Sequence, residues 1–206
     1  ESDLAMAINA TAPKAIAVAA QNIGATVLHI STDYVFNGQN HTPYKERDPT
    51  DPLGVYGKSK LLGEVGVREN SDRHLILRTA WVYGSRGHGN FVKTMLRLGS
   101  ERTELKVVTD QIGSPSWSYD IAIAITQLLP KSWADENING IYHFTNSGVA
   151  SWYDLALATF NEAKQLGFPV KVEQVIPITT AEFPTPTQRP AYSVLAKTKI
   201  TETLGN

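Results

Sequence analysis

Tyr56 and Lys60, four residues apart, are the pair of side chains in this sequence best suited to acid–base chemistry. On a helix, positions i and i+4 share a face, so the phenol and the ammonium can flank one ligand. A phenol has a pKa of about 10, and a nearby ammonium favours the phenolate and lowers that value. We therefore expect Lys60 to bring Tyr56 toward the range useful in general acid–base catalysis. Such a spacing also arises by chance, so the pair needs support from other residues.

Two polar segments supply that support, because each follows a short apolar stretch. The stretch 26–31 leads into three polar residues, Ser31, Thr32 and Asp33. A hydroxyl at this place can hydrogen-bond a substrate carbonyl oxygen and orient it toward the Tyr56 proton, or it can simply cap the end of a strand. The stretch 74–79 leads into Trp81, which either stacks on a ring of the ligand or belongs to the core.

Periodicity indicates the elements that must position these residues. Short runs rich in apolar residues predict strands over 26–31, 74–79, 105–108, 140–144 and 170–176. Helical spacing of apolar residues predicts helices over about 4–24, 55–69, 91–98, 118–129 and 151–166. The long polar stretch 33–54 is expected to be a functional loop, and the Pro/Thr-rich segment 177–190 to end the regular structure.

Alternating helices and largely apolar strands predict a parallel sheet that is covered on both faces. In such sheets the ligand lies beyond the carboxyl ends of the strands, which directs attention to the segments after Ile30 and Thr79. No strand is followed by a glycine-rich phosphate-binding turn, and the chain starts within a helical pattern. We therefore expect the first part of the sheet to lie outside these 206 residues.

Composition excludes several classes of protein. Nineteen basic and 20 acidic residues leave a net charge of −1, which gives no electrostatic reason to expect nucleic acid or an anionic membrane as partner. The chain has no cysteine and its five histidines lack ligand spacing, so no metal site is predicted. No apolar run reaches the roughly 18–20 residues that span a bilayer, and the first residues do not resemble a signal peptide. We expect a cytoplasmic, metal-independent globular protein.

Together these segments resemble the extended short-chain dehydrogenase/reductases, and within them the dTDP-4-dehydrorhamnose reductases. Six blocks in the same order carry the resemblance: HISTDYVF (29–36), DPTDPLGVYGKSKLLGE (48–64), LRTAWVYG (77–84), NFVKTMLRL (90–98), DQIGSP (110–115) and RPAYS (189–193). They run nearly end to end and are far more specific than Tyr-x-x-x-Lys alone.

The resemblance implies an activity, a cofactor and a substrate. It implies reduction of the 4-keto group of dTDP-4-dehydro-L-rhamnose to dTDP-L-rhamnose, a precursor of surface polysaccharides such as lipopolysaccharide, with NADPH or NADH as hydride source. A homodimer is expected by analogy only.

The resemblance also implies a role for each candidate residue. Tyr56 would donate the proton to the sugar C4 oxygen, and Lys60 would bind the nicotinamide ribose and lower the pKa of Tyr56. Thr32 would hydrogen-bond the reacting carbonyl, and Ser31 would join Tyr56 and Lys60 in binding the cofactor. The nucleotide sugar would be contacted by three residues: Thr32, Asp33 and Trp81. Asn9 falls where this superfamily often has a helix asparagine that assists a proton relay.

The implied fold is a Rossmann-like doubly wound parallel sheet with its first βαβ part absent, together with a small α+β substrate-binding domain. Members of the family open with a strand and a glycine-rich turn that cradles the cofactor pyrophosphate, so on the order of 70 residues would be missing. We expect residues 1–84 and 116–130 to form the partial cofactor-binding domain, which carries the catalytic residues. Residues 85–115 and 131–206 would then form the substrate-binding domain.

Related functions on the same fold remain as alternatives. Nucleotide-sugar 4,6-dehydratases typically carry Thr-Asp-Glu after this strand, whereas here Tyr34 follows Asp33, which argues against dehydration. A 4-epimerase would retain Tyr56 and Lys60. A non-catalytic subunit, like the reductase-like regulatory subunit of methionine adenosyltransferase, is the alternative from another class, and retention of Thr32, Tyr56 and Lys60 makes it the weaker one.

Overall fold

Three parallel strands form the central sheet of the computed structural model, which describes residues 2–87, 89–185 and 187–205. They are β1 (Val27–Thr32), β2 (His74–Thr79) and β7 (Gly140–His143), in the order β1-β2-β7. The register pairs Thr32 with Thr79, so β1 and β2 end side by side. The two segments singled out for chemistry therefore leave the sheet at the same edge, as the parallel arrangement predicted.

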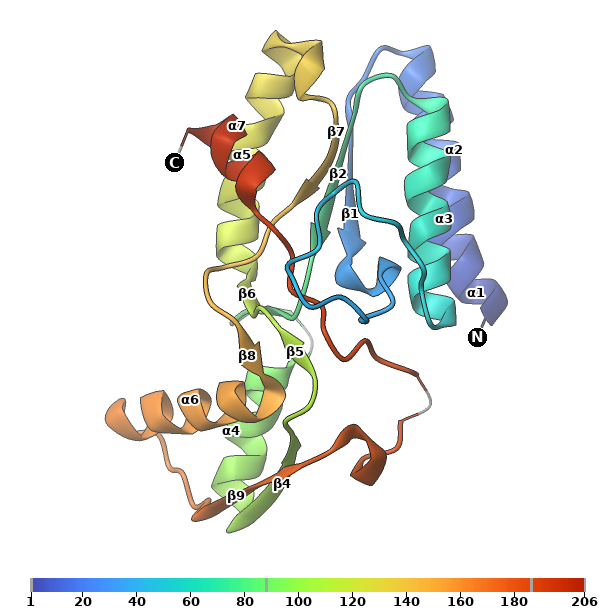
Figure 1. Cartoon of the computed structure of the whole chain (residues 1–206). Helices are drawn as coiled ribbons and strands as arrows, with labels where there is room; N and C mark the ends of the chain where they lie inside the picture. Colours follow the sequence, from blue (N-terminus) through green and yellow to red (C-terminus); the bar gives the residue numbers. More distant parts are fainter. Residues whose placement is uncertain (1, 88, 186, 206) are drawn as a thin grey trace.

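One face of the sheet packs against α5 (Ser118–Ala134) and α7 (Thr198–Leu204) (Figure 1). Leu75 and Leu77 of β2 point to this side, because successive side chains along a strand alternate between faces. They are fully buried in one cluster with apolar residues of β7 and the two helices: Ile121, Ala124, Leu128, Tyr142 and Ile200.

The other face packs against α3 (Val55–Asn70) and a long N-terminal helix. That helix consists of α1 (Ser2–Met6), a π-helical turn η1 (Ala7–Thr11) and α2 (Ala12–Asn22). Ile76 of β2 points to this side and is buried with Val67 of α3 and with small or branched residues of α2 and β1: Ala17, Ala20 and Val27. The sheet is thus covered on both faces, which confirms the layered α/β prediction.

A smaller second part holds its own core. Strands β4 (Glu104–Val108) and β9 (Gln174–Ile178) form a parallel pair that packs against α4 (Phe91–Glu101) and α6 (Trp152–Gln165). Two further short strand pairs lie between the ends of these elements: β3 (Val82–Tyr83) with β6 (Ser116–Trp117), and β5 (Ile112–Gly113) with β8 (Ala150–Ser151). Three short 3-10 helices complete the described elements: η2 (Asp33–Val35), η3 (Glu136–Ile138) and η4 (Thr180–Glu182).

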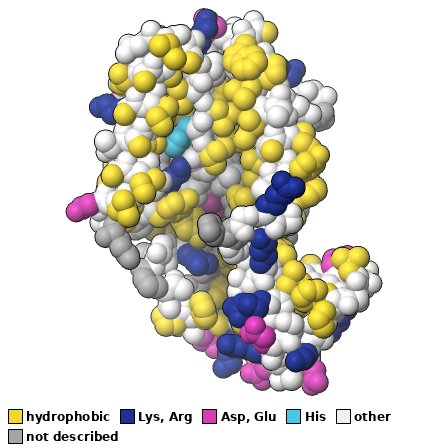
Figure 2. Space-filling view, turned by 180° about the vertical axis from the view of Figure 1, so that it is seen from behind, with side chains coloured by type: hydrophobic (Ala, Val, Ile, Leu, Met, Phe, Trp, Pro, Cys, Tyr) yellow, Lys and Arg dark blue, Asp and Glu magenta, His cyan; other side chains and the backbone are white. Residues whose placement is uncertain are grey.

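Surface chemistry differs between the two parts. Figure 2 shows hydrophobic side chains concentrated over the part that holds the central sheet, whereas charged side chains gather over the smaller part. Leu4, Ile8 and Ile16 of the N-terminal helix, and Ile23 directly after it, are all more than half exposed. Within the described ranges, no helix is both long and apolar enough to cross a membrane.

The structure corrects three expectations about the elements. The expected strand 170–176 begins only at Gln174, because the amides of Lys171 and Val172 bond to the carbonyl of Gly99 at the end of α4. The segment 177–190 does not end the regular structure, since α7 follows it. Residues 131–206 were placed together in the second part, yet β7 pairs with β2 and α7 packs on the same sheet. Which part binds cofactor and which binds substrate stays a prediction.

Gly63 of α3 allows the closest approach between α3 and the N-terminal helix. A Cβ at this position would lie 2.1 Å from the carbonyl oxygen of Asn9. In an open helix, glycine to alanine stabilises by about 1 kcal/mol. Here we expect Gly63→Ala to lower the free energy of unfolding by about 1–3 kcal/mol, because the two helices must separate.

Denaturant unfolding of the two proteins checks this expectation. Leu62→Ala is the control. The Leu62 side chain, next to Gly63 in the sequence, is 50% exposed, so its removal should lower the free energy of unfolding far less. A Gly63→Ala protein as stable as the wild type would contradict the close packing of these helices.

Candidate functional site

Tyr56 and Lys60 lie in the first turns of α3, next to the end of β1. The Lys60 ammonium donates a hydrogen bond to the Ile30 carbonyl (Nζ···O 2.5 Å), and the Thr32 hydroxyl lies near enough to the Tyr56 phenol to influence its pKa. Gly57 makes this approach possible, since a Cβ there would lie 2.2 Å from the Tyr34 carbonyl oxygen. The structure therefore brings together the three residues that the sequence placed in one catalytic site.

The pKa of the Tyr56 phenol is raised above its usual value, so the predicted lowering by Lys60 is wrong for this arrangement. Burial of the phenol is the largest cause; the Thr32 hydroxyl opposes the rise and the nearby Asp33 carboxylate adds to it. The Lys60 ammonium is turned to the Ile30 carbonyl, and burial lowers its own pKa. Tyr56 is therefore neutral at pH 7 and holds a proton to give, while 44% of its surface stays accessible.

Ser31 is committed to the interior. Its hydroxyl donates a 2.5 Å hydrogen bond to Oε1 of Glu64, and only 3% of the residue is exposed. The predicted contact between this side chain and a cofactor is therefore not available in this arrangement, because the hydroxyl points into the layer between the sheet and α3.

Asp33 is a buried carboxyl group directly beneath Thr32. It accepts a hydrogen bond from the Thr32 hydroxyl (3.0 Å), and its Oδ2 has no hydrogen-bond partner among the described residues. Burial raises the pKa of Asp33 to about 6, because a charge is costly to hold away from water. Covered in this way, Asp33 does not reach a ligand directly and acts on Thr32 instead.

The Trp81 indole packs against two neighbours, Trp152 and Gly113. One face stacks on Trp152, with ring centroids 3.5 Å apart and an interplanar angle of 7°. A Cβ on Gly113 would lie 2.6–2.9 Å from three indole atoms, so the backbone of Gly113 covers Trp81 as well. One face of the indole is therefore occupied by Trp152, and the predicted contact of Trp81 with the nucleotide sugar stays a prediction.

The backbone of Trp81 is strained. Its φ is +48°, in the left-handed region that is rare for a bulky side chain. Strain of this kind persists where the surroundings over-determine the conformation, and it clusters at functional sites. Here the stack on Trp152 and the contact with Gly113 supply that constraint.

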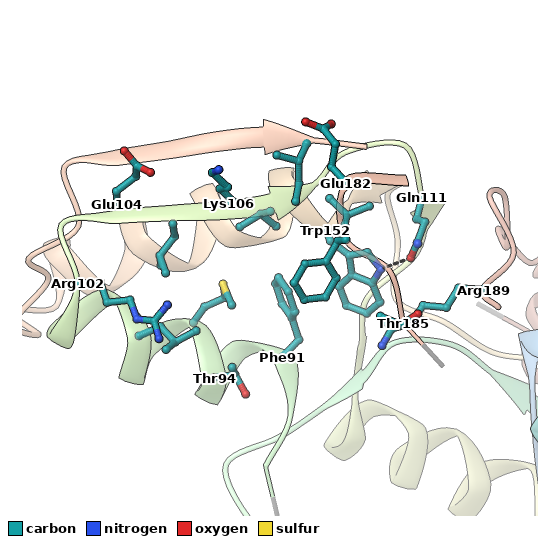
Figure 3. Close-up of a pocket in the computed structure, with 17 residues that line it drawn as sticks. Phe91, Thr94, Arg102, Glu104, Lys106, Gln111, Trp152, Glu182, Thr185 and Arg189 are labelled. Atoms are coloured by element: carbon teal, nitrogen blue, oxygen red, sulfur yellow. Dashed lines mark hydrogen bonds between the residues drawn. The ribbon is translucent and has the colours of Figure 1, made fainter. Parts of the chain in front are cut away.

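A cavity of about 640 Å³ lies in the smaller part, between α4 and the strand pair β4–β9 (Figure 3). Aromatic and aliphatic side chains make up much of its lining, including Phe91, Met95, Leu98, Trp152, Ile178 and Phe183. Arg102 and Arg189 lie toward opposite ends of it (Figure 3). Such a lining, apolar with a few polar groups, is typical of small-molecule sites. Sequence reasoning assigned no role to these residues, although Phe91 and Arg189 belong to blocks that carry the family resemblance.

Aromatic contacts connect this cavity to the end of β2. Trp152 lines the cavity, stacks on Trp81 and contacts Phe91, whose ring centroid is 4.7 Å away. The indole N–H of Trp152 donates to Oε1 of Gln111 (3.0 Å), and Nε2 of Gln111 donates to Thr180 Oγ1. The position of Trp81 is thus tied to the wall of the cavity.

Arg189 lies between the cavity and the Tyr56 site. It lines the cavity, and its charge favours the phenolate of Tyr34, although burial and Asp33 together raise the pKa of Tyr34 to about 12. The Tyr34 ring contacts the Tyr56 ring edge to face at 5.7 Å. A molecule that reaches from Tyr56 into the cavity would therefore pass Arg189.

Asn9 serves the contact between helices rather than the site itself. Its side-chain amide donates to Ser59 Oγ (3.1 Å), and its carbonyl packs against Gly63. The predicted part of Asn9 in a proton relay stays a prediction.

Comparison with known proteins supports the resemblance read from the six blocks. A family model described as the RmlD substrate binding domain matches residues 1–206. The chain is 44% identical over 195 residues to a dTDP-4-dehydrorhamnose reductase of Escherichia coli K12, covering 95% of this chain. It spans only 65% of the length of that relative.

Solved structures agree with this match and confirm the Rossmann-like fold. A dTDP-4-dehydrorhamnose reductase of Bacillus anthracis in complex with NADP has a TM-score of 0.89 at 40% identity, covering 100% of this chain and 73% of that one. An orthologue from Clostridium acetobutylicum has a TM-score of 0.84 at 43% identity, covering 98% and 67%.

Asp33 generates a prediction about stability and pH. Its pKa of about 6 lies above the usual 3.8, so the folded state binds more protons than the unfolded state between these values. Its contribution to the free energy of unfolding therefore falls as pH rises from 4 to 6, by about 3 kcal/mol in all. We expect Asp33→Asn to remove this contribution, so that the variant gains stability over the wild type as pH rises.

Denaturant unfolding of both proteins at pH 4, 5, 6 and 7.5 measures this difference. Buried His29 and His143, with pKa values lowered to about 4 and about 3, act in the opposite direction, but they are common to both proteins and cancel. A difference in stability that stays constant with pH would contradict the raised pKa of Asp33.

Proposed function

The chain belongs to the family of the RmlD substrate binding domain, and on that premise we propose that the protein reduces the 4-keto group of dTDP-4-dehydro-L-rhamnose to dTDP-L-rhamnose with NADPH or NADH. The observation that carries this proposal is the neutral Tyr56 phenol beside the Thr32 hydroxyl, at the carboxyl edge of a parallel sheet. Reduction of a ketone needs a proton at the oxygen as the hydride reaches the carbon.

Tyr56 would donate that proton. Its raised pKa keeps the phenol protonated at neutral pH, which is the form a proton donor needs. Thr32 would hydrogen-bond the same carbonyl oxygen and hold it against the phenol. In the structure the Thr32 hydroxyl donates its hydrogen bond to Asp33. To bind the substrate carbonyl it must turn away from that carboxyl group.

Lys60 fits the ribose of a nicotinamide cofactor. An ammonium has three donors, and in the described residues Lys60 uses one of them, on the Ile30 carbonyl. The other two can reach ribose hydroxyls, since Ile30 is 39% exposed beside it. When bound, the nicotinamide supplies the hydride. A Bacillus anthracis relative was solved with NADP, which supports NADPH for this chain.

The cavity fits the nucleotide half of the substrate. Phe91 and Trp152 offer aromatic surface for the base, and about 640 Å³ accommodates a nucleoside. Arg189, between this cavity and Tyr56, is placed for the diphosphate that joins nucleoside and sugar. With the nucleotide held there, the sugar would extend toward Tyr56 past the edge of Trp81. A homodimer and a cytoplasmic location stay predictions.

Tyr56→Phe tests the proton donor. We expect kcat of the full-length gene product to fall by about 10²–10⁴, because one acid–base group is lost, and KM for the sugar nucleotide to change little. NADPH absorbance with dTDP-4-dehydro-L-rhamnose measures both quantities. The control is Tyr119→Phe, which alters a 59% exposed tyrosine on α5. Unchanged turnover in Tyr56→Phe would sink the assignment.

Arg189→Gln tests the diphosphate site. We expect KM for dTDP-4-dehydro-L-rhamnose to rise about 10–100-fold, because hydrogen bonds to charged groups are worth about 1.5–3 kcal/mol, while KM for NADPH stays the same. Arg97→Gln is the control, since that exposed arginine pairs with Glu101 on α4 outside the cavity. Equal KM values in the Arg189 variant and the wild type would place the diphosphate elsewhere.

A further inference from the structure

Glu64 is a fully buried carboxylate to which the proposed mechanism gives no role. Only 1% of the residue is exposed, so it reaches neither substrate nor cofactor. Oε1 accepts hydrogen bonds from the Ser31 hydroxyl (2.5 Å) and Arg78 Nε (2.9 Å), and Oε2 accepts one from Arg78 Nη2 (2.6 Å). The guanidinium of Arg78 is equally buried. Helix α3 is thus tied to both β1 and β2 through one side chain.

The two partners of Glu64 lie opposite each other in the sheet. Ser31 of β1 and Arg78 of β2 form one pair of the parallel register, and the next pair is Thr32 with Thr79. The Glu64 carboxylate therefore binds the two strands at the residue pair directly before Thr32 and Thr79. A sliding movement of α3 along either strand would break at least one of its hydrogen bonds.

Tyr56, Lys60 and Glu64 follow one another at intervals of four residues, so they share one face of α3. Each contacts a different residue at the end of β1: Tyr56 the Thr32 side chain, Lys60 the Ile30 carbonyl and Glu64 the Ser31 hydroxyl. Only the last of these contacts is sealed from solvent. Glu64 also forms a bidentate ion pair with Arg78, a contact that fixes the geometry of both side chains.

Stability alone does not account for such an arrangement. Buried ion pairs lose so much hydration that replacing both partners by apolar residues is often neutral or stabilising. A buried ion pair does restrict the positions of its partners, because separating them leaves an unpaired buried charge that costs several kcal/mol. A shift of about 1 Å in a reacting group lowers rates by about a hundredfold.

We propose that Glu64 is a positioning residue for the reduction: its contacts with Ser31 and Arg78 fix α3 on the sheet so that Tyr56 and Lys60 face Thr32. The inference rests on the proposed function. Lys60 is faced by Tyr56 and Glu64 from its own helix and by His29 from β1. Glu64 raises the pKa of Lys60 against the effect of burial, and His29 stays neutral, with its pKa lowered to about 4.

The test removes both charges at once, as Glu64→Met with Arg78→Met in the full-length gene product. We expect a folded protein in which kcat falls about 10–100-fold, KM values stay within about threefold, and the alkaline limb of the kcat profile moves to lower pH. The titration of Lys60, followed by NMR of ¹³C-labelled lysine in the ligand-free protein, should move in the same direction. A folded double variant with wild-type kcat and an unmoved Lys60 titration would overturn the proposal.

Two further variants keep the test decisive. Ser31→Ala leaves the ion pair intact and removes one hydrogen bond, so we expect it to fold and to lose kcat by about 2–10-fold. Leu128→Ala removes a fully buried side chain on the opposite face of the sheet and should lower stability while kcat stays unchanged. Equal losses of kcat in Leu128→Ala and in the double variant would count against positioning. A wild type that oxidises no NADPH would refute the proposed function, whereas the Lys60 titration tests Glu64 in either case.

Discussion

The buried carboxylate of Glu64 constrains the geometry of the sheet edge at which Tyr56, Lys60 and Thr32 meet. Water cannot solvate it, so its charge is tolerated only where Ser31 and Arg78 supply three hydrogen bonds. Those partners lie on neighbouring strands, and this fixes a helix and two strands relative to one another. Gly57 and Gly63 then let α3 come into direct contact with the Tyr34 and Asn9 carbonyls. The positions of Tyr56, Lys60 and Thr32 follow from this packing.

The second part of the chain depends on a different interaction, the stack of Trp81 on Trp152. Trp81 leaves the end of β2 in a strained left-handed conformation, which costs on the order of 1–3 kcal/mol. Aromatic stacking offsets part of that cost, by about 0.5–1.5 kcal/mol beyond the area buried. The stack also connects the sheet to α6 and hence to the cavity wall. The same residues that hold the two parts together thus set the distance between the cavity and Tyr56.

Much of the central sheet could be predicted from the sequence. The strand His74–Thr79 and the start of α3 at Val55 fall where the pattern placed them, because apolar runs and helical spacing record burial directly. The helix α7 could not be found in this way, since Ile200 alone among its seven residues is buried. Spacing also brought Tyr56 and Lys60 to one face correctly.

The spacing of residues along the sequence does not predict the direction in which a side chain points. Burial raises the pKa of Tyr56 while the Lys60 ammonium is turned to the Ile30 carbonyl, so the predicted shift in the pKa of Tyr56 had the wrong sign. Ser31 was predicted to face a ligand and instead faces Glu64. The cavity and the stack of Trp81 on Trp152 depend on contacts between distant segments, which no local pattern records.

The most direct test of this account follows the hydride itself. The full-length gene product would be incubated with dTDP-4-dehydro-L-rhamnose and NADPH deuterated at the transferable position of the nicotinamide, and the product examined by NMR. The account predicts dTDP-L-rhamnose that carries one deuterium, at C4 of the sugar. Recovery of the keto sugar without deuterium, or with deuterium at another carbon, would contradict the claim that this edge of the sheet protonates a C4 oxygen during reduction.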